Sequence, residues 1–119
     1  MHRIGVKLIK KLAEPFQITQ WEVYDLPDNI DYKESFSAII DFMDKNNFES
    51  LKASTNIIIV PGYQFKTIKG MITNFHQPQS TLLLLIAAGV GEKWRDIYNY
   101  ALANEYRFLS YGDSSLLVF

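Results

Sequence analysis

The first half of the chain carries two stripes of apolar side chains at helical spacing. The first stripe consists of Ile4, Leu8, Ile9 and Leu12, and the basic residues Arg3, Lys7, Lys10 and Lys11 fall largely opposite it. Pro15 marks the exit from this helix, because proline disfavours helical backbone in the residue before it. The pattern predicts an amphipathic helix at the start of the chain.

A second helix is predicted to begin after Asp31. This aspartate and Glu34 have the spacing of a capping box, in which a side chain binds a free backbone N–H of the first turn. The apolar stripe that follows is Phe36, Ile39, Ile40 and Met43. It ends near Asn46, and the helix is expected to end there.

Strand patterns occur in four places. Gln17–Tyr24 largely alternates polar and apolar residues and predicts a half-buried strand, before a turn over Leu26–Ile30. Ile57–Val60 is apolar on both faces, which is typical of a central strand covered on both sides. The other two predicted strands are Gly70–Thr73 and Leu116–Phe119.

Two helices are predicted between the last two strands. Ser80 or Thr81 can cap a helix over Leu82–Ala88, which Gly89 and Gly91 would end. The next helix has the most regular stripe in the chain, formed by Trp94, Ile97, Tyr98, Ala101 and Leu102. Helices and strands interleave, so we expect an α/β fold with a mixed sheet and helices on both faces. At 119 residues the chain is expected to be a single domain spanning 1–119.

Composition supports a folded chain and leaves its partners open. Hydrophobic residues make up 48% of the chain and aromatic residues 14%, which argues against disorder. The net charge of −1 gives no overall attraction to nucleic acid, so any RNA contact must come from a local patch. The absence of cysteine excludes disulfides, thiolate nucleophiles and cysteine-ligated zinc.

The sequence shows neither the pattern of a signal peptide nor that of a membrane span. The first residues are basic and amphipathic, without the apolar segment of a signal peptide. The longest apolar run, Leu82–Ala88, is far shorter than the ~20 residues that a membrane span needs. We therefore expect a soluble, cytoplasmic protein with no membrane partner.

Polar side chains gather in a segment between a predicted strand and a predicted helix. The segment holds Asn74, His76, Gln79, Ser80 and Thr81, which supply an acid/base group, amides and hydroxyls. In open α/β folds ligands collect at this end of the strands, near the free N–H groups of a helix. A purely structural reading is also open, in which Ser80 and Thr81 cap the helix and Asn74 braces a turn.

A second polar segment precedes the last predicted strand. Here Gly112 permits a tight turn and Asp113 can hydrogen-bond back into it. Arg107 is suited to carboxylate or phosphate, and Asp113 to hydroxyl groups or a positive charge. Alternatively, Arg107 pairs with Asp113 or Glu105 and has only a structural role.

Two further patches have the residue types that bind RNA. One is the basic stripe of the first helix, which fits either the phosphates of an RNA or a solvated helix face. In the other, Lys66 and Lys69 interleave with Tyr63 and Phe65, as in sites that stack an unpaired base. Aromatic residues at that spacing also commonly pack inward.

Several common sites are not predicted. Gly89-Val90-Gly91 follows a helix rather than a strand, so it is not a dinucleotide-binding loop. His2 and His76 are the only histidines and lack metal-ligand spacing, so no metal is expected. No Ser/His/Asp hydrolase pattern is present.

The two polar segments together resemble the signature of a known family. Asn74-Phe75-His76-Gln77-Pro78-Gln79-Ser80-Thr81 and Arg107-Phe108-Leu109-Ser110-Tyr111-Gly112-Asp113 are similar to motifs of the S-adenosylmethionine:tRNA ribosyltransferase-isomerases of queuosine biosynthesis. The resemblance spans roughly Ile57 to Leu117. It implies that the chain is the C-terminal part of a larger α/β catalytic domain, and that the remainder of the full-length chain is a partner.

The resemblance also implies a reaction. Family members transfer and isomerise the ribosyl group of S-adenosylmethionine, a co-substrate, onto 7-aminomethyl-7-deazaguanine at the wobble position of tRNA, giving epoxyqueuosine. It implies catalytic roles for His76, Asp113 and Tyr111, with His76 as acid/base. It further implies substrate binding by Asn74, Gln79, Ser80, Thr81, Arg107 and Ser110. No metal is implied, and the isolated chain is expected to be inactive.

This chain departs from the family pattern at a few positions. Gln79 stands where lysine or arginine is usual, and it cannot neutralise an anion. Gln77 replaces a commoner leucine, and Ser114-Ser115-Leu116 differs from the usual Ala-Met ending. Two other functions therefore stay open: a non-catalytic RNA- or nucleoside-binding module, and a structural half of an α/β domain.

Overall fold

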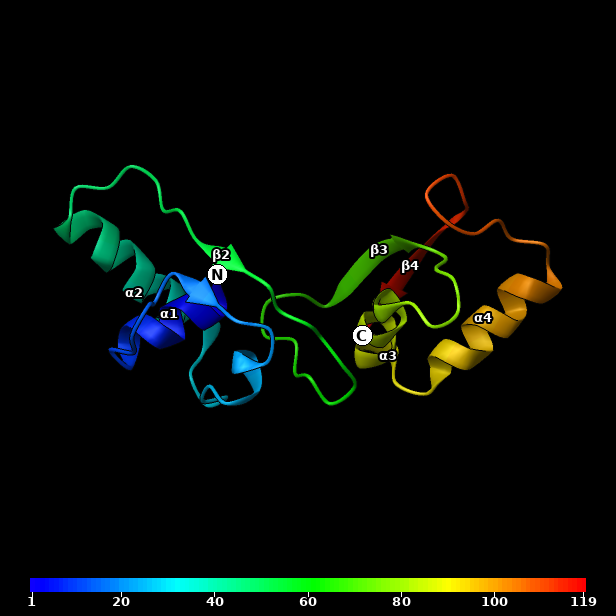
Figure 1. Cartoon of the computed structure of the whole chain (residues 1–119), viewed down its shortest axis with the longest axis horizontal. Coiled ribbons are helices and arrows are strands. Elements are labelled where there is room, and N and C mark those ends of the chain that lie inside the picture. The colour runs from blue at the N-terminus through cyan, green and yellow to red at the C-terminus, as the bar shows by residue number, and fades with distance from the viewer. The chain divides into compact units, whose positions relative to one another are not determined.

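The computed structural model describes all residues from Met1 to Phe119 and divides them into two compact units, Met1–Ile58 and Ile59–Phe119 (Figure 1). The elements of the first unit are α1 (His2–Ile9), β1 (Gln17–Ile18), the 3-10 helix η1 (Glu22–Tyr24), α2 (Tyr32–Lys45) and β2 (Ser54–Thr55). Those of the second are β3 (Gly70–Asn74), α3 (Thr81–Val90), α4 (Lys93–Ala103) and β4 (Ser114–Val118).

In the first unit α1 packs directly against α2. Gly5 makes this close approach possible, because a Cβ there would lie 2.0 Å from the backbone oxygen of Ser35. Ser35 is itself fully buried, and its hydroxyl donates to the Tyr32 carbonyl at 3.0 Å. Any side chain larger than glycine at position 5 would therefore force the two helices apart.

The basic stripe of α1 is not a solvated face. Arg3 is only 6% exposed and Lys7 only 3%. Each is paired with an acidic residue from the segment between the two helices: Arg3 with Asp28 at 2.7 Å, and Lys7 with Glu22 at 2.5 Å. The expectation that the whole stripe faces solvent or phosphate is wrong for these two residues, since buried cations must be paired.

The run Ile57–Val60 is not a strand, contrary to the sequence prediction. Backbone amides of Ser54, Asn56 and Ile58 donate at 2.9–3.2 Å to the carbonyls of Phe16, Ile18 and Gln20. This ladder makes β1 and β2 a parallel pair, with Gln17 opposite Ser54. The pairing therefore falls on the polar residues before the apolar run and stops at its second residue. The predicted strand over Gln17–Tyr24 is correct only for Gln17–Ile18, since η1 occupies its end.

In the second unit β3 and β4 pair antiparallel, with Gly70 opposite Val118 and Asn74 opposite Ser114. Both predicted strands are confirmed within a few residues. One face of the pair carries buried Leu117, and α3 packs on β4 and on α4. The buried core of this unit is Phe75, Ile86, Tyr98, Ala101 and Leu117.

The helix ends follow their predicted caps. Asp31 accepts from the Lys33 amide at 3.3 Å at the start of α2. Ser80, rather than Thr81, caps α3 by accepting from the Leu82 amide at 3.2 Å. Gly91, with φ of 60°, ends that helix. Gly89 lies inside α3, where a Cβ would collide with the ring of Phe119, so it is a packing residue and does not end the helix.

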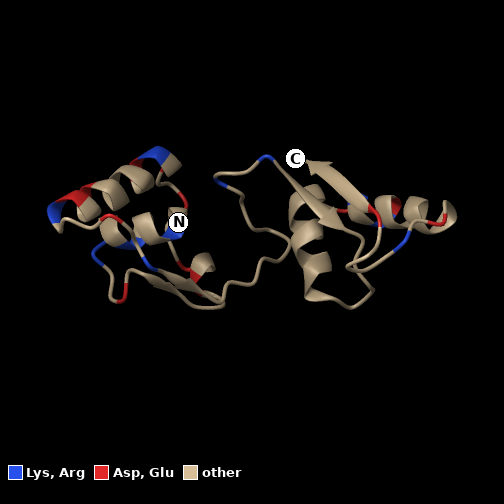
Figure 2. Cartoon of the chain, turned by 90° about the horizontal axis from the view of Figure 1, so that it is seen from above, with Lys and Arg blue, Asp and Glu red and all other residues tan.

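The mixed α/β class is confirmed, with four α-helices and two separate two-stranded sheets in place of one larger sheet. The assignment of the whole chain to one domain stays a prediction, because two compact units can belong to one domain. Figure 2 shows charged residues along α2 and around α1, whereas β3, α3 and β4 carry none. Each helix falls short of the length and apolar character that a membrane-spanning segment requires.

Candidate functional site

The two polar segments predicted from the sequence meet at one end of the β3–β4 pair. The Phe75 amide donates to the Asp113 carbonyl at 3.3 Å, which extends the ladder by one bond. The Leu109 amide then donates to the Phe75 carbonyl at 2.8 Å. Backbone bonds thus join the segment after β3 to the segment before β4, more than 30 residues later.

Asn74 braces this junction with both ends of its amide. Its Nδ2 donates to the carbonyls of Leu109 and Ser110, at 3.2 and 3.4 Å. Its Oδ1 accepts from the Ser114 hydroxyl at 2.7 Å. Leu109 has a φ of 73°, which is unfavourable for a side chain with a Cβ, and the bond from Asn74 helps to hold it there.

His76 is fixed at its backbone and at its ring. Its amide donates to the hydroxyl of Tyr98 on α4 at 3.0 Å, and its Nε2 lies 2.8 Å from Thr73 Oγ1. Burial raises the pKa of Tyr98, while the bond from His76 opposes that rise. The phenol therefore stays protonated at neutral pH. The imidazole is half-buried, so one side remains open to solvent.

A cleft of about 280 Å³ opens beside this imidazole. It is lined by Asn74, His76, Gln77, Ser80, Leu82, Leu109 and Ser110. The structure therefore brings together four predicted site residues: Asn74, His76, Ser80 and Ser110. An imidazole beside two hydroxyls at a helix N-terminus can move a proton and hydrogen-bond a polyol such as ribose.

Arg107 and Asp113 form a separate exposed pair. The Arg107 guanidinium donates to Asp113 Oδ1 at 3.0 Å, and the Arg107 amide donates to Oδ2 at 2.8 Å. The Arg107 side chain holds the pKa of Asp113 below its usual range, and Asp113 raises the pKa of Arg107. Gly112 fits inside this turn, because a Cβ would lie 2.5 Å from the Arg107 carbonyl oxygen. The structural pairing left open by the sequence is thus present.

Three other predicted site residues lie outside the cleft. Gln79, with φ of 64°, and Thr81, the first residue of α3, are both exposed. Tyr111 is 97% exposed. None of the three lines the cleft beside His76.

Sequence reasoning missed three residues that hold the site together: Thr73, Tyr98 and Ser114. The sequence pattern places Thr73 at a strand end and Tyr98 in the apolar stripe of α4. Ser114 stands out in the sequence only as a departure from the family pattern. A polar hydroxyl within an apolar stripe is the one signal that singles out Tyr98, because a buried phenol needs a partner.

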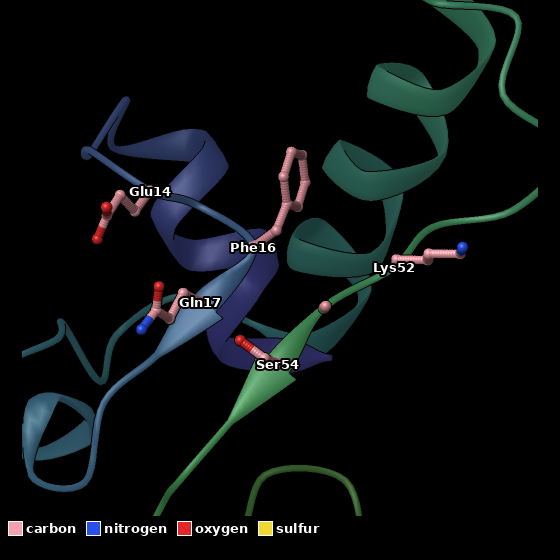
Figure 3. Close-up of a pocket in the computed structure, with 6 residues that line it drawn as sticks. Glu14, Phe16, Gln17, Lys52 and Ser54 are labelled. Carbon is pink, nitrogen blue, oxygen red and sulfur yellow. The ribbon is translucent and has the colours of Figure 1, made fainter.

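The other candidate patches are less suited to binding. Phe65 packs on Tyr63 and Phe119, with ring centroids 5.3 and 4.8 Å apart, so its ring already has aromatic partners within its own unit. An open groove of about 460 Å³ lies beside β1 and β2 (Figure 3). There the side chains of Glu14 and Lys52 point in opposite directions. No cluster of three metal-ligating side chains is present.

Comparisons with known proteins agree with one another. A family model described as queuosine biosynthesis protein matches residues 33–117. S-adenosylmethionine:tRNA ribosyltransferase-isomerases from Erythrobacter litoralis and Halothermothrix orenii are 55% and 44% identical to this chain, over 65 and 77 residues. These matches cover 54% and 64% of this chain, but only 19% and 23% of the relatives. The chain thus spans about a fifth of the length of the relatives it matches.

A solved structure of a protein with the same activity in its name is also similar to this chain. The S-adenosylmethionine tRNA ribosyltransferase of Thermotoga maritima aligns with a TM-score of 0.54 and 31% identity. The alignment covers 70% of this chain and 31% of the Thermotoga chain.

Proposed function

The chain belongs to the queuosine biosynthesis protein family, and from this membership we propose that it is part of an S-adenosylmethionine:tRNA ribosyltransferase-isomerase. The observation that carries the proposal is the meeting of the two polar segments around His76. The proposed substrates are S-adenosylmethionine and a tRNA carrying 7-aminomethyl-7-deazaguanine at its wobble position. A tRNA substrate also favours a cytoplasmic location.

The proposed chemistry begins at the ribose of S-adenosylmethionine. The sulfonium acidifies the C5′ protons, and removal of one of them by a base leaves an ylide that breaks the C4′–O4′ bond. The oxygen freed from C4′ becomes a carbonyl at C1′ as adenine leaves with a proton. The aminomethyl nitrogen then adds to C4′ of the vinyl sulfonium and loses a proton. The ylide carbon C5′ bonds to C1′, and the C1′ oxygen displaces methionine from C5′ to close the epoxide. This sequence needs a base, a proton donor for the departing adenine and groups that orient the ribose.

His76 is the proposed acid/base. It is held at two points, by Tyr98 and by Thr73, and such double fixation favours proton transfer along one direction. Ser80 and Ser110 line the same cleft and are proposed to bind ribose hydroxyls. Asn74 has its amide occupied by three partners, so its proposed role is to hold the loop.

The exposed residues receive roles at the edge of the site. Arg107 keeps N–H donors beyond the one bound to Asp113, and we assign these to a carboxylate or a phosphate. Asp113 acts in this proposal by fixing the side chain of Arg107. Asp113 and Tyr111 are proposed to orient the ribose or the sulfonium of S-adenosylmethionine. Gln79 and Thr81 flank Ser80 at the N-terminus of α3 and are assigned to an anionic group of the substrate.

A chimera tests the proposal. Residues 33–117 of this chain replace the matching segment of the Thermotoga maritima enzyme, and transfer of ribosyl label from S-adenosylmethionine to tRNA is measured together with adenine release. We expect the chimera to transfer label and the isolated 119-residue chain to transfer none. If the larger exchange does not fold, exchange of Gly70–Val118 alone makes the same test.

The outcomes separate the candidate functions. A folded chimera that binds tRNA but releases no adenine would leave the chain as a binding module. A folded chimera with neither property would leave it as a structural half of an α/β domain. Label transfer by the isolated chain would contradict the expectation that this chain is inactive without the rest of the enzyme.

A further inference from the structure

The ring of His76 is bound to the protein through only one of its two nitrogens. Its Nε2 lies 2.8 Å from the hydroxyl oxygen of Thr73. The other nitrogen, Nδ1, has no hydrogen-bond partner within the protein and is not sealed from solvent. Because His76 lines the cleft of about 280 Å³, Nδ1 is the ring nitrogen that is left for a bound molecule.

The bond between Nε2 and Thr73 can be made in two ways. A neutral imidazole carries one hydrogen, which lies on either nitrogen. With the hydrogen on Nε2, the ring donates to Thr73 Oγ1, and Nδ1 keeps a lone pair. With the hydrogen on Nδ1, the Thr73 hydroxyl donates to Nε2, and Nδ1 can only donate. The two forms therefore present opposite chemistry at Nδ1, a proton acceptor in the first and a hydrogen-bond donor in the second.

A second contact of the Thr73 hydroxyl distinguishes the two forms. Its Oγ1 donates to the carbonyl oxygen of Asn74 at 3.4 Å. A hydroxyl has a single hydrogen, so it cannot donate to this carbonyl and to Nε2 of His76 together. When the hydrogen points to the carbonyl, Oγ1 accepts from Nε2–H and both contacts are satisfied. The opposite form satisfies only the contact with the ring and leaves two acceptor oxygens facing each other.

The position of the Asn74 carbonyl in the sheet favours this second contact. Residues directly opposite each other in an antiparallel pair alternate between hydrogen-bonded and non-hydrogen-bonded pairs. The Phe75 amide donates to the Asp113 carbonyl at 3.3 Å, so the preceding pair, Asn74 with Ser114, is the non-bonded kind. The Asn74 carbonyl therefore points away from β4 and can accept from a donor outside the ladder. The Thr73 hydroxyl is such a donor.

We propose that Thr73 is a positioning residue that holds His76 in its Nε2–H form, so that Nδ1 is the atom that takes a proton from the substrate. In this transfer the C5′–H bond of the substrate breaks, its electron pair stays on the carbon, and an N–H bond forms at Nδ1. The hydrogen on Nε2 stays in place. The Asn74 carbonyl, the Thr73 hydroxyl and the ring form a chain of hydrogen bonds, and its dipoles stabilise the imidazolium that results.

The proposal rests on the proposed function only in taking His76 as the group that receives the proton. The position of the ring hydrogen is a property of the folded chain and can be measured without substrate. Failure of the chimera to transfer label would leave the Nε2–H form intact. Finding the other form would leave the reaction intact and assign the removal of the C5′ proton to another base.

Nitrogen NMR of the 119-residue chain tests the position of this hydrogen. Long-range proton–nitrogen correlations of the ring are recorded near pH ~8.5, where an ordinary imidazole is neutral. The signals of His76 are those lost in His76→Gln, since His2 is the only other histidine. We expect Nε2 at the shift of a protonated nitrogen and Nδ1 at that of an unprotonated one. A protonated Nδ1, or both nitrogens at averaged shifts, would overturn the proposal.

Variants at one position test the role of Thr73. Thr73→Val keeps the shape of the side chain but lacks the hydroxyl, so the ring should exchange between its two forms and both nitrogens should move to intermediate shifts. Thr73→Ser should keep the shifts of the unsubstituted chain. Unchanged shifts in a folded Thr73→Val variant would show that another group sets the form of His76. If that variant does not fold, Thr73→Ala makes the same test.

Ser115→Ala is the matched control. It removes a hydroxyl that donates to the Thr73 carbonyl at 3.2 Å and does not contact the ring. The ring shifts of His76 should therefore stay the same in this variant. Movement of the ring shifts as large as in Thr73→Val would mean that any disturbance of β3 has this effect, and would contradict a specific role of the Thr73 hydroxyl.

Turnover of the chimera supplies the second readout. Thr73→Val should lower kcat by about fivefold or more, the worth of one hydrogen bond to a developing charge, and should leave KM unchanged. Thr73→Ser should recover most of the loss. A kcat for Thr73→Val equal to that of the unsubstituted chimera, or an equal fall in Ser115→Ala, would overturn the positioning role.

Discussion

The two units of this chain differ in where their ion pairs lie, buried in the first unit and exposed in the second. The first unit buries cationic side chains inside its fold, and pairs Arg3 with Asp28 and Lys7 with Glu22. The second unit has a core of apolar and aromatic residues, and its pair between Arg107 and Asp113 lies on the surface. The same residue types are therefore structural in one unit and accessible in the other. Burial, and not residue type, decides which polar groups are open to a ligand.

This difference directs the search for chemistry to the second unit. A buried ion pair is costly to break, so its members are poor candidates for binding a substrate. Hydroxyls, amides and an imidazole around a small apolar core can exchange solvent for a ligand at little cost. Four predictions test how far the contrast holds.

The largest effect is expected for Phe75→Ala. The ring of Phe75 contacts those of Tyr98, Tyr106 and Phe108 at centroid distances of 5.4–5.5 Å. Its removal should cost about 3–5 kcal/mol of unfolding free energy in the second unit. Native-state hydrogen exchange should show lost protection in β3 and α4 and unchanged protection in α1 and α2. Equal loss in both units would show that they unfold together.

A smaller loss is expected for Lys7→Met. The substitution keeps the aliphatic bulk but leaves Glu22 and the Gln17 carbonyl without the ammonium that now binds them, at 2.5 and 2.8 Å. Because Glu22 is partly exposed, we expect a cost of about 2 kcal/mol in urea unfolding, below the range for a fully buried pair. Lys10→Met, at the exposed C-cap of the same helix, is the control and should change stability by less than about 0.5 kcal/mol. A loss of similar size in the control would argue against the pair.

The pH dependence of stability should come mainly from the first unit. The bond from Lys7 holds the pKa of Glu22 below its ordinary value of 4.5. Between the folded and unfolded pKa values the unfolded chain binds more protons, so stability should fall as pH drops below about 4.5. Glu22→Gln should flatten this fall and cost about 1 kcal/mol at pH 7. Asp113→Asn should change it less, because its pair is exposed and screened by solvent. A steeper dependence on Asp113 would reverse the comparison.

The smallest effect is expected for Gln79→Gly. Gln79 has a φ of 64°, which strains a residue with a Cβ, and its side chain is exposed. Glycine relieves that strain but gains freedom in the unfolded chain, so the net gain in stability should be only about 0.5 kcal/mol. Thermal unfolding of the variant measures it. A clear loss of stability would mean that the Gln79 side chain makes a contact that matters.

Local patterns predicted most of the elements. Asp31 and Ser80 each cap the helix that their spacing indicated, and the stripe from Trp94 to Leu102 lies within α4. These features depend on neighbours within one or two turns, which the sequence displays directly. The strands β3 and β4 were predicted for the same reason.

Such patterns do not predict contacts between residues that lie far apart in the sequence. Arg3 and Lys7 repeat at helical spacing on a face that looks solvated, and only the fold brings Asp28 and Glu22 to them. Likewise, the bond from the His76 amide to Tyr98 joins residues 22 positions apart. Ile57–Val60 has the composition of a central strand, yet the parallel ladder with β1 falls mainly on the residues before it. Register depends on the partner strand, and a single segment does not specify it.

The residues of the candidate site could likewise be predicted only in part. Motif resemblance pointed to His76, Asn74, Ser80 and Ser110, which the structure gathers in one cleft. It could not separate Arg107 and Asp113, which pair with each other, from the residues that line that cleft. The contact of Ser114 with Asn74 was not predicted either, since only the folded β3–β4 pair brings these two side chains close. The contact of Thr73 with His76 is local, but nothing in the sequence pattern singles it out.

The most direct test of the central claim is the turnover of the Thermotoga maritima chimera carrying His76→Gln. Glutamine is close to histidine in size and can hydrogen-bond to Thr73, but it cannot exchange a proton near neutral pH. The account predicts a fall in kcat of at least about 100-fold, the range for loss of a general acid or base, with unchanged melting temperature and tRNA affinity. Turnover within a few-fold of the unsubstituted chimera would contradict the assignment of acid/base chemistry to this cleft.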